Sequence, residues 1–356
     1  MIQKLTRLLE IYSIKITSWL LFFKKEKQFG LHGFSLKKIT YYKKGFFSSH
    51  PIQYDFKKYN YSDYISDIEN IKLAYINHPY GRLLRNKLIF SNFFNSYFKT
   101  PECYCIVNKG IFEPVNYSIY IDSFSKFLDL AKQKKLILKP LLGTAGIGVT
   151  LIEFHKDNSY FVNKKLLLIE QIRILLESIN DYLVEEFIEQ GDFTKKFFPQ
   201  TTNTIRLTTF AYPDFSSSFI PYGFIRFGRV KTVPVDNISL GGLFSIIDLN
   251  TGTLSEAYEE TKDRKVIRHI HHPDSGVLIK GTQIPHWDKL KNFFVQLGGV
   301  IKPFIKIVGW DIVLTNDSFI VIEGNNGPDI YFQGLDYPLA KNEDVIKFLK
   351  GYKIRK

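Results

Sequence analysis

The segment 309–325, GWDIVLTNDSFIVIEGN, constrains the fold more than any other part of the chain. Two runs of β-branched and aromatic residues, WDIVL and FIVIE, flank Thr-Asn-Asp-Ser, which is typical of a turn. This pattern predicts a β-hairpin. If the turn is centred near Asp317, Asp311 and Glu323 lie opposite each other. Side chains alternate between the two faces of a strand, so Asn325 points the same way as Glu323.

This register gathers two carboxylates and one amide on one face of an apolar hairpin. Like charges directly opposite each other destabilise a sheet. A divalent cation between Asp311 and Glu323 would remove the repulsion, and Asn325 would add a neutral oxygen. A small number of hard oxygen ligands is typical of Mg²⁺, which takes its other ligands from water and phosphates. The hairpin therefore predicts a magnesium site.

A second pattern, LILKPLLGTAGIGVTLIEF at 136–154, predicts two strands joined by a glycine-rich turn. Gly143, Gly146 and Gly148 allow a tight backbone, and the amides exposed in such a turn can bind phosphate. The segment is neither a Walker P-loop nor a dinucleotide-binding fingerprint, because GKS/T is missing and a strand, not a helix, follows. An ordinary glycine-rich hairpin is the alternative interpretation.

Two lysines and an acidic segment extend this pattern. Lys139 lies within an apolar strand, where it either reaches solvent or neutralises an anion, and the neighbouring glycines favour the anion. Lys87 lies on a predicted amphipathic helix, where a solvated lysine is the alternative. The segment 182–192, YLVEEFIEQGD, predicts a strand whose free backbone groups can pair with adenine and whose acids can bind ribose; an edge strand with exposed acids is the alternative. Together these features indicate nucleotide-dependent phosphoryl transfer.

The order of these motifs resembles the ATP-grasp superfamily. More narrowly, five segments are similar to the sugar-transfer-associated ATP-grasp proteins of bacterial surface-polysaccharide gene clusters: NTIRLTTF (203–210), DNISLGG (236–242), HPDSG (272–276), IPHWDKL (284–290) and GWDI…IEGNNGPD (309–329). The resemblance covers about residues 80–335. It implies an α+β ATP-grasp fold, in which two subdomains grip ATP, and it leaves the N-terminal residues unassigned.

The resemblance also implies roles for individual residues. ATP phosphates would contact Lys87 and Lys139, beneath a loop containing Gly143, Thr144, Ala145, Gly146 and Gly148. Adenine and ribose would contact Glu185, Glu186, Phe187, Ile188 and Asp192. One or two Mg²⁺ ions would bind Asp311, Glu323 and Asn325. The substrate side would contain Asn203, Thr204, Arg226, Asn237, Gly241 and Gly242, although a glycine pair is commonly just a turn.

Arg206, in the predicted strand TIRLTTF, is assigned a catalytic role together with Lys139 by the same resemblance. A planar guanidinium would stabilise the charge on a transferring phosphoryl group or an acyl phosphate. A structural ion pair is the alternative for Arg206. Arg226 and Arg229 lie an odd number of residues apart, so at most one of them is expected to face a substrate.

Mixed strands and helices predict an α+β architecture. We expect helices at 82–98, 123–134, 166–178 and 285–300. The expected divisions are a basic, mainly helical N-terminal region (1–80), the N-terminal part of the ATP-grasp core (81–135), a lid subdomain with the glycine-rich loop (136–190), and a C-terminal subdomain with the magnesium and acceptor sites (191–356).

The net charge of +13 is concentrated near the N-terminus, where residues 1–60 hold twelve Lys/Arg and three Asp/Glu. A solvated basic face, a surface for an anionic membrane or glycan, and a nucleic-acid site are the three interpretations. Nucleic acid is not expected as a partner, because no known binding motif accompanies the charge. The two cysteines, spaced C-x-C, and the lack of a long apolar run favour a cytoplasmic protein, with peripheral contact at the inner membrane face as a hypothesis.

The implied activity is that of an ATP-dependent carboxylate–amine or carboxylate–thiol ligase that acts through an acyl phosphate. The implied partners are ATP, Mg²⁺, a carboxylate such as a uronic acid or sugar nucleotide, and an amine. A kinase that phosphorylates a hydroxyl and a non-catalytic scaffold are the alternatives. We expect Asp311→Asn to abolish nucleotide-induced stabilisation and to stabilise the free protein by relieving the repulsion.

Overall fold

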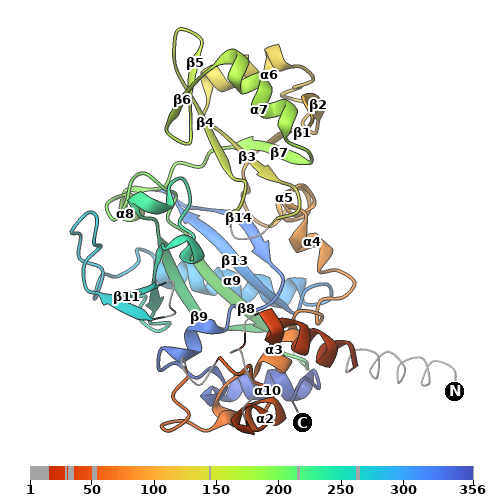
Figure 1. The fold of residues 1–356 in the computed structure, drawn as a ribbon, viewed down its shortest axis with the longest axis vertical. Coiled ribbons are helices and arrows are strands. Elements are labelled where there is room, and N and C mark those ends of the chain that lie inside the picture. The colour runs from red at the N-terminus through yellow and green to blue at the C-terminus, as the bar shows by residue number, and fades with distance from the viewer. Residues whose placement is uncertain are drawn as a thin grey trace, which may run out of the picture.

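Two antiparallel sheets lie one above the other in the computed structural model, and a group of helices lies below them (Figure 1). The structure describes residues 16–28, 30, 36–49, 54–143, 146–214, 217–261 and 265–355. Each sheet has seven strands, and helices pack on both. The mixture confirms the predicted α+β architecture.

The upper sheet has the order β2-β1-β7-β3-β4-β5-β6. Its strands are β1 (Cys103–Asn108), β2 (Ile111–Pro114), β3 (Leu136–Pro140), β4 (Thr150–Lys156), β5 (Ser159–Val162), β6 (Lys165–Leu168) and β7 (Tyr182–Glu186). Helices α6 (Phe124–Gln133) and α7 (Ile169–Ser178) cover one face. Phe127 of α6 and Ile172 of α7 share a buried cluster with Leu136 and Val184, because each helix carries its apolar residues on one side.

The lower sheet has the order β12-β11-β10-β9-β8-β13-β14. Its strands are β8 (Ile205–Ala211), β9 (Ser218–Phe227), β10 (Leu243–Ile247), β11 (Leu254–Glu260), β12 (Val266–His269), β13 (Ile307–Leu314) and β14 (Phe319–Asn325). Helix α9 (Trp287–Ile301) packs Phe294 and Leu297 into the cluster that contains Leu207 and Trp310. Helix α10 (Glu343–Gly351) contributes Phe348 to a separate cluster with Phe210.

The hairpin of β13 and β14 has the predicted pairing of Asp311 with Glu323. The turn itself is centred between 316 and 317, as the pairing of Leu314 with Phe319 shows. That register alone would place Ile322 opposite Asp311. A bulge at this point adds one residue to β14, so that Glu323 takes the place opposite Asp311. The prediction is confirmed, through a bulge that the sequence pattern did not indicate.

The N-terminal part contains a helix over 16–28 and the short helices α2 (Leu36–Lys43), α3 (Asp67–Leu73), α4 (Arg82–Arg85) and α5 (Lys87–Phe94). Ser66 begins α3 with a capping box, because its side chain accepts from the Glu69 amide and Glu69 binds the Ser66 amide in return. The other elements of the described residues are helix α8 (Asp192–Lys195) and the 3₁₀ turns η2 (Tyr61–Asp63), η3 (Val230–Thr232), η4 (Ile238–Leu240), η5 (Tyr331–Gly334) and η6 (Leu339–Lys341). None of the described helices has both the length and the apolar character that a membrane span requires.

The structure differs from the sequence prediction at two helices. The single helix expected at 82–98 is interrupted at Asn86, whose extended backbone forms a bridge with Leu142. Residues 166–168, expected to begin a helix, instead belong to the β5–β6 hairpin, and the helix begins at Ile169. In both places pairing with a neighbouring segment outweighs the local preference.

Candidate functional site

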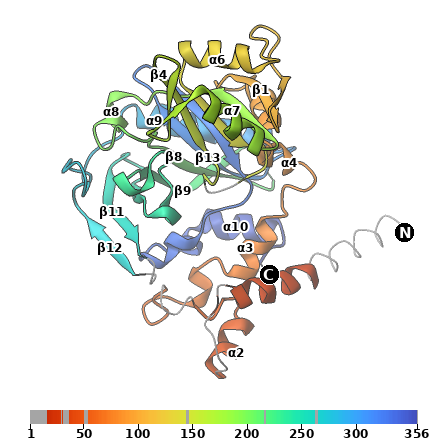
Figure 2. The same cartoon turned by 45° about the horizontal axis from the view of Figure 1, so that its top comes forward.

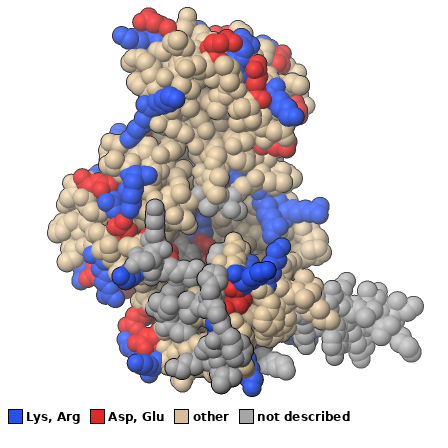
Figure 3. All heavy atoms as spheres, viewed as in Figure 1, with Lys and Arg blue, Asp and Glu red and all other residues tan. Residues whose placement is uncertain are grey.

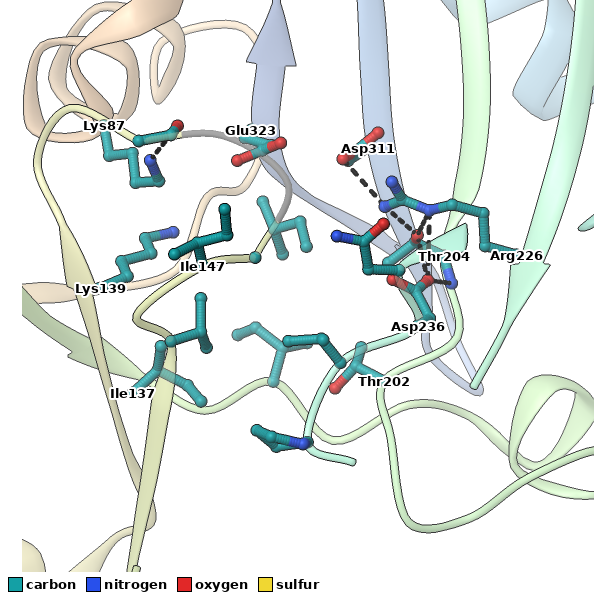
Figure 4. Close-up of a pocket in the computed structure, with 18 of the residues that line it drawn as sticks. Lys87, Ile137, Lys139, Ile147, Thr202, Thr204, Arg226, Asp236, Asp311 and Glu323 are labelled. Carbon is teal, nitrogen blue, oxygen red and sulfur yellow. Dashed lines mark hydrogen bonds and ion pairs between the residues drawn. The ribbon is translucent and has the colours of Figure 1, made fainter. Parts of the chain in front are cut away.

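A cavity of about 470 Å³ lies between the two sheets (Figure 4). In the space-filling view, the surface between the upper sheet and the lower part of the molecule is hollowed (Figure 3). Most of the residues singled out from the sequence line this cavity: Lys87, Lys139, Gly143, Gly146, Glu185, Glu186, Phe187, Ile188, Thr204, Arg206, Arg226, Asn237, Asp311, Glu323 and Asn325. Segments more than 200 residues apart in the sequence therefore meet in one place.

Lys87 and Lys139 form the cationic wall of the cavity. Lys87 is the first residue of α5, where the interruption at Asn86 directs it toward the glycine-rich loop, and its Nζ donates to the Gly143 carbonyl at 3.0 Å. Lys139 extends from β3, and its Nζ lies 2.5 Å from Oε1 of Glu185 on the neighbouring β7. The lysine predicted to bind phosphate and the acid predicted near adenine thus form a buried ion pair.

Burial shifts the pKa of a lysine and of a glutamate on this wall, in opposite directions. Burial lowers the pKa of the Lys87 ammonium below its ordinary value, and the nearby Lys139 contributes in the same direction. Burial raises the pKa of the Glu185 carboxyl, although Lys139 opposes this shift. A polyanionic ligand would therefore be favourable here, because it would supply negative charge to two crowded ammonium groups.

The glycine-rich loop contacts a second loop across the cavity. Gly146 and Gly148 have φ angles of +66° and +79°, which disfavour any residue with a Cβ. A Cβ added at Gly146 would lie 3.2 Å from Cγ1 of Val235, so the backbone here packs closely against the segment that precedes Asp236. Thr144 and Ala145, which were predicted to contact ATP, lie outside the described residues.

Arg206 and Arg226 form the opposite wall. Arg206, on β8, pairs through Nε with Asp311 on the adjacent β13, and through Nη1 with Asp329. Arg226, on β9, lies 3.0 Å from the second oxygen of Asp311 and 3.4 Å from Oδ2 of Asp236. Each oxygen of the Asp311 carboxylate therefore has its own guanidinium.

This arrangement decides the charge state of Asp311. Burial alone would raise the pKa of its carboxyl, but Arg206 and Arg226 outweigh burial and hold that pKa below its ordinary range. Burial likewise opposes the charge of Arg206, yet Asp311 and Asp329 raise the pKa of the guanidinium. Two arginines thus relieve the repulsion within the hairpin, a role that the sequence pattern gave to a cation alone.

Glu323 lacks such a partner. Among the described residues it receives a hydrogen bond from Asn325 Nδ2, at 3.2 Å from Oε1, and forms no ion pair. Burial, together with the neighbouring Asp311 carboxylate, raises the pKa of the Glu323 carboxyl. The cavity lining as a whole carries seven carboxylates and four cationic side chains. An additional cation would be stabilised beside Glu323.

The donor set fits magnesium in its chemistry. Asp311, Glu323 and Asn325 offer two carboxylates and an amide, which are hard oxygen donors. Within the described residues no three His, Cys, Asp or Glu side chains are grouped as a complete metal site. A cation here would take its remaining ligands from water and from the phosphates of a bound nucleotide, as Mg²⁺ does.

Several predicted residues lie outside the cavity lining: Gly148, Asp192, Asn203, Gly241 and Gly242. Asp192 is exposed at the start of α8, where its Oδ2 accepts a hydrogen bond from Asn316 at 3.3 Å. Asn203 is fully buried and donates to Gln190, Thr194 and Phe198, an arrangement that holds the start of β8. The predicted ligand roles of these residues stay predictions.

The cavity residues that were not singled out from the sequence include Thr202, Asp236 and Asp329. Asp236 accepts from the Thr204 backbone amide at 2.9 Å and from its hydroxyl at 2.5 Å. Both acids belong to segments that carried the family resemblance, DNISLGG and GNNGPD. The available signal was an acid beside a glycine-containing loop, which also describes many ordinary turns.

Arg229 and His272 lie outside the cavity lining. Arg229 pairs with Asp274 at 2.8 Å and with Glu259 at 3.0 Å, and of the two arginines Arg226 lines the cavity. His272 is buried, stacks on Phe198, and its Nε2 lies 2.9 Å from the Gly228 carbonyl. A loop-positioning role for this histidine follows from these contacts.

His272 also gives a pH-dependent contribution to stability. Burial lowers the pKa of its imidazole in the folded state, so the unfolded chain binds a proton more readily. Stability conferred by the neutral ring is therefore present above the unfolded pKa of about 6.5 and is lost as the pH falls below it. Urea unfolding from pH 8 to pH 5 should show a steeper loss in the natural protein than in His272→Asn. The exposed neighbour provides the control, His271→Asn, which should keep the steep profile.

Comparison with known proteins places these features in a family. The model of the sugar-transfer associated ATP-grasp family matches residues 70–341. No curated protein matches the chain. Among solved structures, phosphoribosylamine–glycine ligase from Thermotoga maritima is 12% identical, with a TM-score of 0.42 over 78% of this chain and 56% of that one.

Two further structures show similar values. L-amino acid ligase from Bacillus licheniformis is 10% identical, with a TM-score of 0.39 over 76% of this chain and 48% of that one. The biotin carboxylase domain of 2-oxoglutarate carboxylase from Hydrogenobacter thermophilus, in complex with MgADP and bicarbonate, is 9% identical, with a TM-score of 0.38 over 76% of this chain and 46% of that one. This chain thus spans about half the length of these proteins. Because the family model covers most of the chain, from residue 70 to residue 341, the protein belongs to the sugar-transfer associated ATP-grasp family.

Proposed function

We propose that the protein is an ATP-dependent ligase that joins a carboxylate to an amine, or to a thiol, through an acyl phosphate. The observation that carries the proposal is the meeting of two lysines and a glycine-rich loop with Arg206, Asp311 and Glu323 in one cavity. The lysines suit phosphates, and the opposite wall suits a metal ion and developing negative charge. Family membership supports ATP as the nucleotide.

The proposed reaction has two steps. A carboxylate oxygen of the substrate attacks the γ-phosphorus of ATP, the bond to the β-phosphate oxygen breaks, and ADP leaves. The amine nitrogen then attacks the acyl carbon of the acyl phosphate, inorganic phosphate leaves with the bonding electron pair, and the nitrogen loses a proton. Both steps need positioning and charge stabilisation rather than a protein nucleophile.

The residues of this chain have separate roles in the proposal. Lys87 and Lys139 bind the phosphates, and the strand that ends near Glu186 borders the adenine. Arg206 is held by Asp311 and Asp329 with its guanidinium fixed, which suits stabilisation of a phosphoryl group in transfer. A fixed cation needs no reorganisation when negative charge develops.

Magnesium and the acceptor substrate occupy the rest of the proposed site. Asp311, Glu323 and Asn325 would hold one or two Mg²⁺ ions, which neutralise phosphate charge when bound. Arg226, Thr204 and the segment at Asn237 would form the acceptor side. The family description supports a sugar-linked carboxylate, such as a uronic acid or a sugar nucleotide in surface-polysaccharide synthesis, as the substrate class. An amide would be the product.

A co-substrate screen tests this proposal. Amino acids and simple amines are paired with nucleotide-linked and polymeric uronic acids, and ADP, free phosphate and product mass are measured. A ligase releases ADP and free phosphate only when both co-substrates are present, and its product gains the mass of the amine minus water. Retention of phosphate on the product would identify a kinase. Failure of MgATP to bind at all would favour a scaffold.

The Lys139–Glu185 pair gives a prediction about the phosphate wall. Lys139→Met should lower the free energy of unfolding by about 3 kcal/mol, because it leaves the buried Glu185 carboxylate without its ammonium. Adding Glu185→Gln should restore most of that stability, whereas affinity for MgADP should stay low in both variants. Urea unfolding and calorimetric titration measure the two quantities.

Glu185→Gln alone is the control for the double variant, since it shows what the loss of the acid does to nucleotide binding. Recovery of both stability and MgADP affinity in the double variant would mean that Lys139 serves only to pair Glu185. In that case the phosphate role of Lys139 is wrong.

A further inference from the structure

The helix over residues 16–28 presents an apolar stripe to solvent. Its members are Ile16, Trp19, Leu20 and Phe23, with exposed fractions of 61%, 39%, 67% and 51%. Spacings of three and four residues place them on one side of a helix with 3.6 residues per turn. Figures 1 and 2 both show this helix, in dark red, at the edge of the molecule on the side of the end marked N.

A different side of the same helix is packed into the protein. Phe22 is fully buried and contacts Phe47 and Tyr42, with ring centroids 5.0 and 6.0 Å apart. Glu26 is 8% exposed, and it accepts hydrogen bonds from the Ser48 hydroxyl at 2.5 Å and from the Tyr42 hydroxyl at 2.9 Å. The helix is therefore anchored by its own buried side, and the exposed stripe is an additional surface.

The charges around the stripe are basic. Lys24, Lys25 and Lys27 are exposed and directly follow Phe23, while the intervening acid, Glu26, is buried and binds Ser48 and Tyr42. By contrast, on the face drawn in Figure 3, Lys/Arg and Asp/Glu are interspersed over the upper part of the molecule. Within residues 16–28, the apolar stripe thus has exposed lysines next to it and no exposed acid.

We propose that this stripe binds the surface of an anionic lipid bilayer. An amphipathic helix with Trp, Phe and Leu on one side and lysines beside them lies in the headgroup region, where the apolar side chains insert and the lysines meet anionic headgroups. Trp19 suits this boundary, because its ring has an apolar body and a polar N–H. The proposal rests on residues outside the cavity and goes beyond the proposed function.

A second copy of the chain fits this surface less well. A two-fold dimer uses the same patch on both subunits, so the lysines after Phe23 on each copy would face either the other copy's apolar side chains or its lysines. Like charges at an interface are unfavourable. An anionic bilayer supplies the opposite charge together with apolar depth.

Vesicle sedimentation of the full chain tests the proposal. Vesicles of phosphatidylcholine alone are compared with vesicles that also contain phosphatidylglycerol, at low and high salt. Binding is expected only to the anionic vesicles and should weaken at high salt. Leu20→Ser with Phe23→Ser, and separately Lys24→Glu with Lys27→Glu, should each reduce binding by about tenfold or more.

The matched control removes exposed apolar residues elsewhere. Ile111 on β2 and Val300 on α9 have exposed fractions of 66% and 61%, so Ile111→Ser with Val300→Ser should leave vesicle binding unchanged. Circular dichroism confirms that each variant is folded. No vesicle binding, equal binding to neutral vesicles, or unchanged binding in the Leu20/Phe23 variant would overturn the proposal. So would a mass that shows a dimer dependent on Leu20 and Phe23, since a second copy would then occupy the stripe.

Discussion

Asp311→Asn is expected to lower the free energy of unfolding of the ligand-free protein by about 3 kcal/mol. The carboxylate is 2% exposed and its two oxygens pair with Arg206 and Arg226. A neutral amide leaves the two guanidinium groups with Asp329 and Asp236 as their remaining ion-pair partners among the described residues. The same variant should lose its stabilisation by MgADP. Urea unfolding with and without nucleotide measures both effects.

Asp317→Asn is the matched control for this prediction. Asp317 lies in the exposed turn of the same hairpin, so its replacement should change stability by less than about 0.5 kcal/mol. An Asp311→Asn protein as stable as the natural one would show that the arginines do not hold the carboxylate. The assignment of charge balance in the cavity would then be wrong.

Glu323→Gln is expected to have the opposite signature. ADP release in the complete reaction should fall on the order of 100-fold or more, because an anionic oxygen donor for Mg²⁺ is lost. The ligand-free protein should be at least as stable as the natural one, since burial and Asp311 disfavour the charge on Glu323, and Gln can keep the hydrogen bond from Asn325. Thermal unfolding without ligands and steady-state kinetics are the measurements.

The pair of variants separates two roles that the hairpin places side by side. Both variants replace a carboxylate by an amide of the same shape. A difference in stability between them would therefore come from the different partners of the two carboxylates. Full activity in Glu323→Gln would contradict the magnesium role of Glu323. Equal destabilisation in the two variants would contradict the division between an arginine-paired and an unpaired carboxylate.

The hairpin shows how far local pattern can predict a site. Apolar runs, a polar turn and strand alternation predicted that Asp311 opposes Glu323, and the pairing confirms it, although the bulge that produces this pairing was not predicted. The family match confirms the ATP-grasp resemblance as well. These inferences succeed because strand period and turn composition are properties of a short segment.

The partners of Asp311 could not be predicted in the same way. Arg206 lies 105 residues earlier, and it meets the hairpin only because β8 and β13 are neighbours in the sheet. From the hairpin alone, relief of repulsion by Asp311→Asn was the reasonable expectation for the free protein. The structure predicts the opposite change in the free energy of unfolding. The variant removes the negative charge with which the two guanidinium groups are paired.

Lys87 illustrates a second limit. On spacing alone it belonged to one continuous helix, in which a solvated lysine was the favoured interpretation. The bridge between Asn86 and Leu142 interrupts that helix and places Lys87 at the start of α5, beside the glycine-rich loop. The contact depends on a segment more than fifty residues away, which helical periodicity does not report.

The extra residue in β14 has a consequence for how chains of this family can vary in length. Because Ile322 is the extra residue at the bulge, deletion of this single residue would make β14 regular and leave Glu323 opposite Asp311. A related chain could therefore lack this residue, or differ in length within the solvent-facing turn, and still pair the two acids. A one-residue insertion between the turn and Glu323, by contrast, would need a second bulged residue to keep Glu323 opposite Asp311.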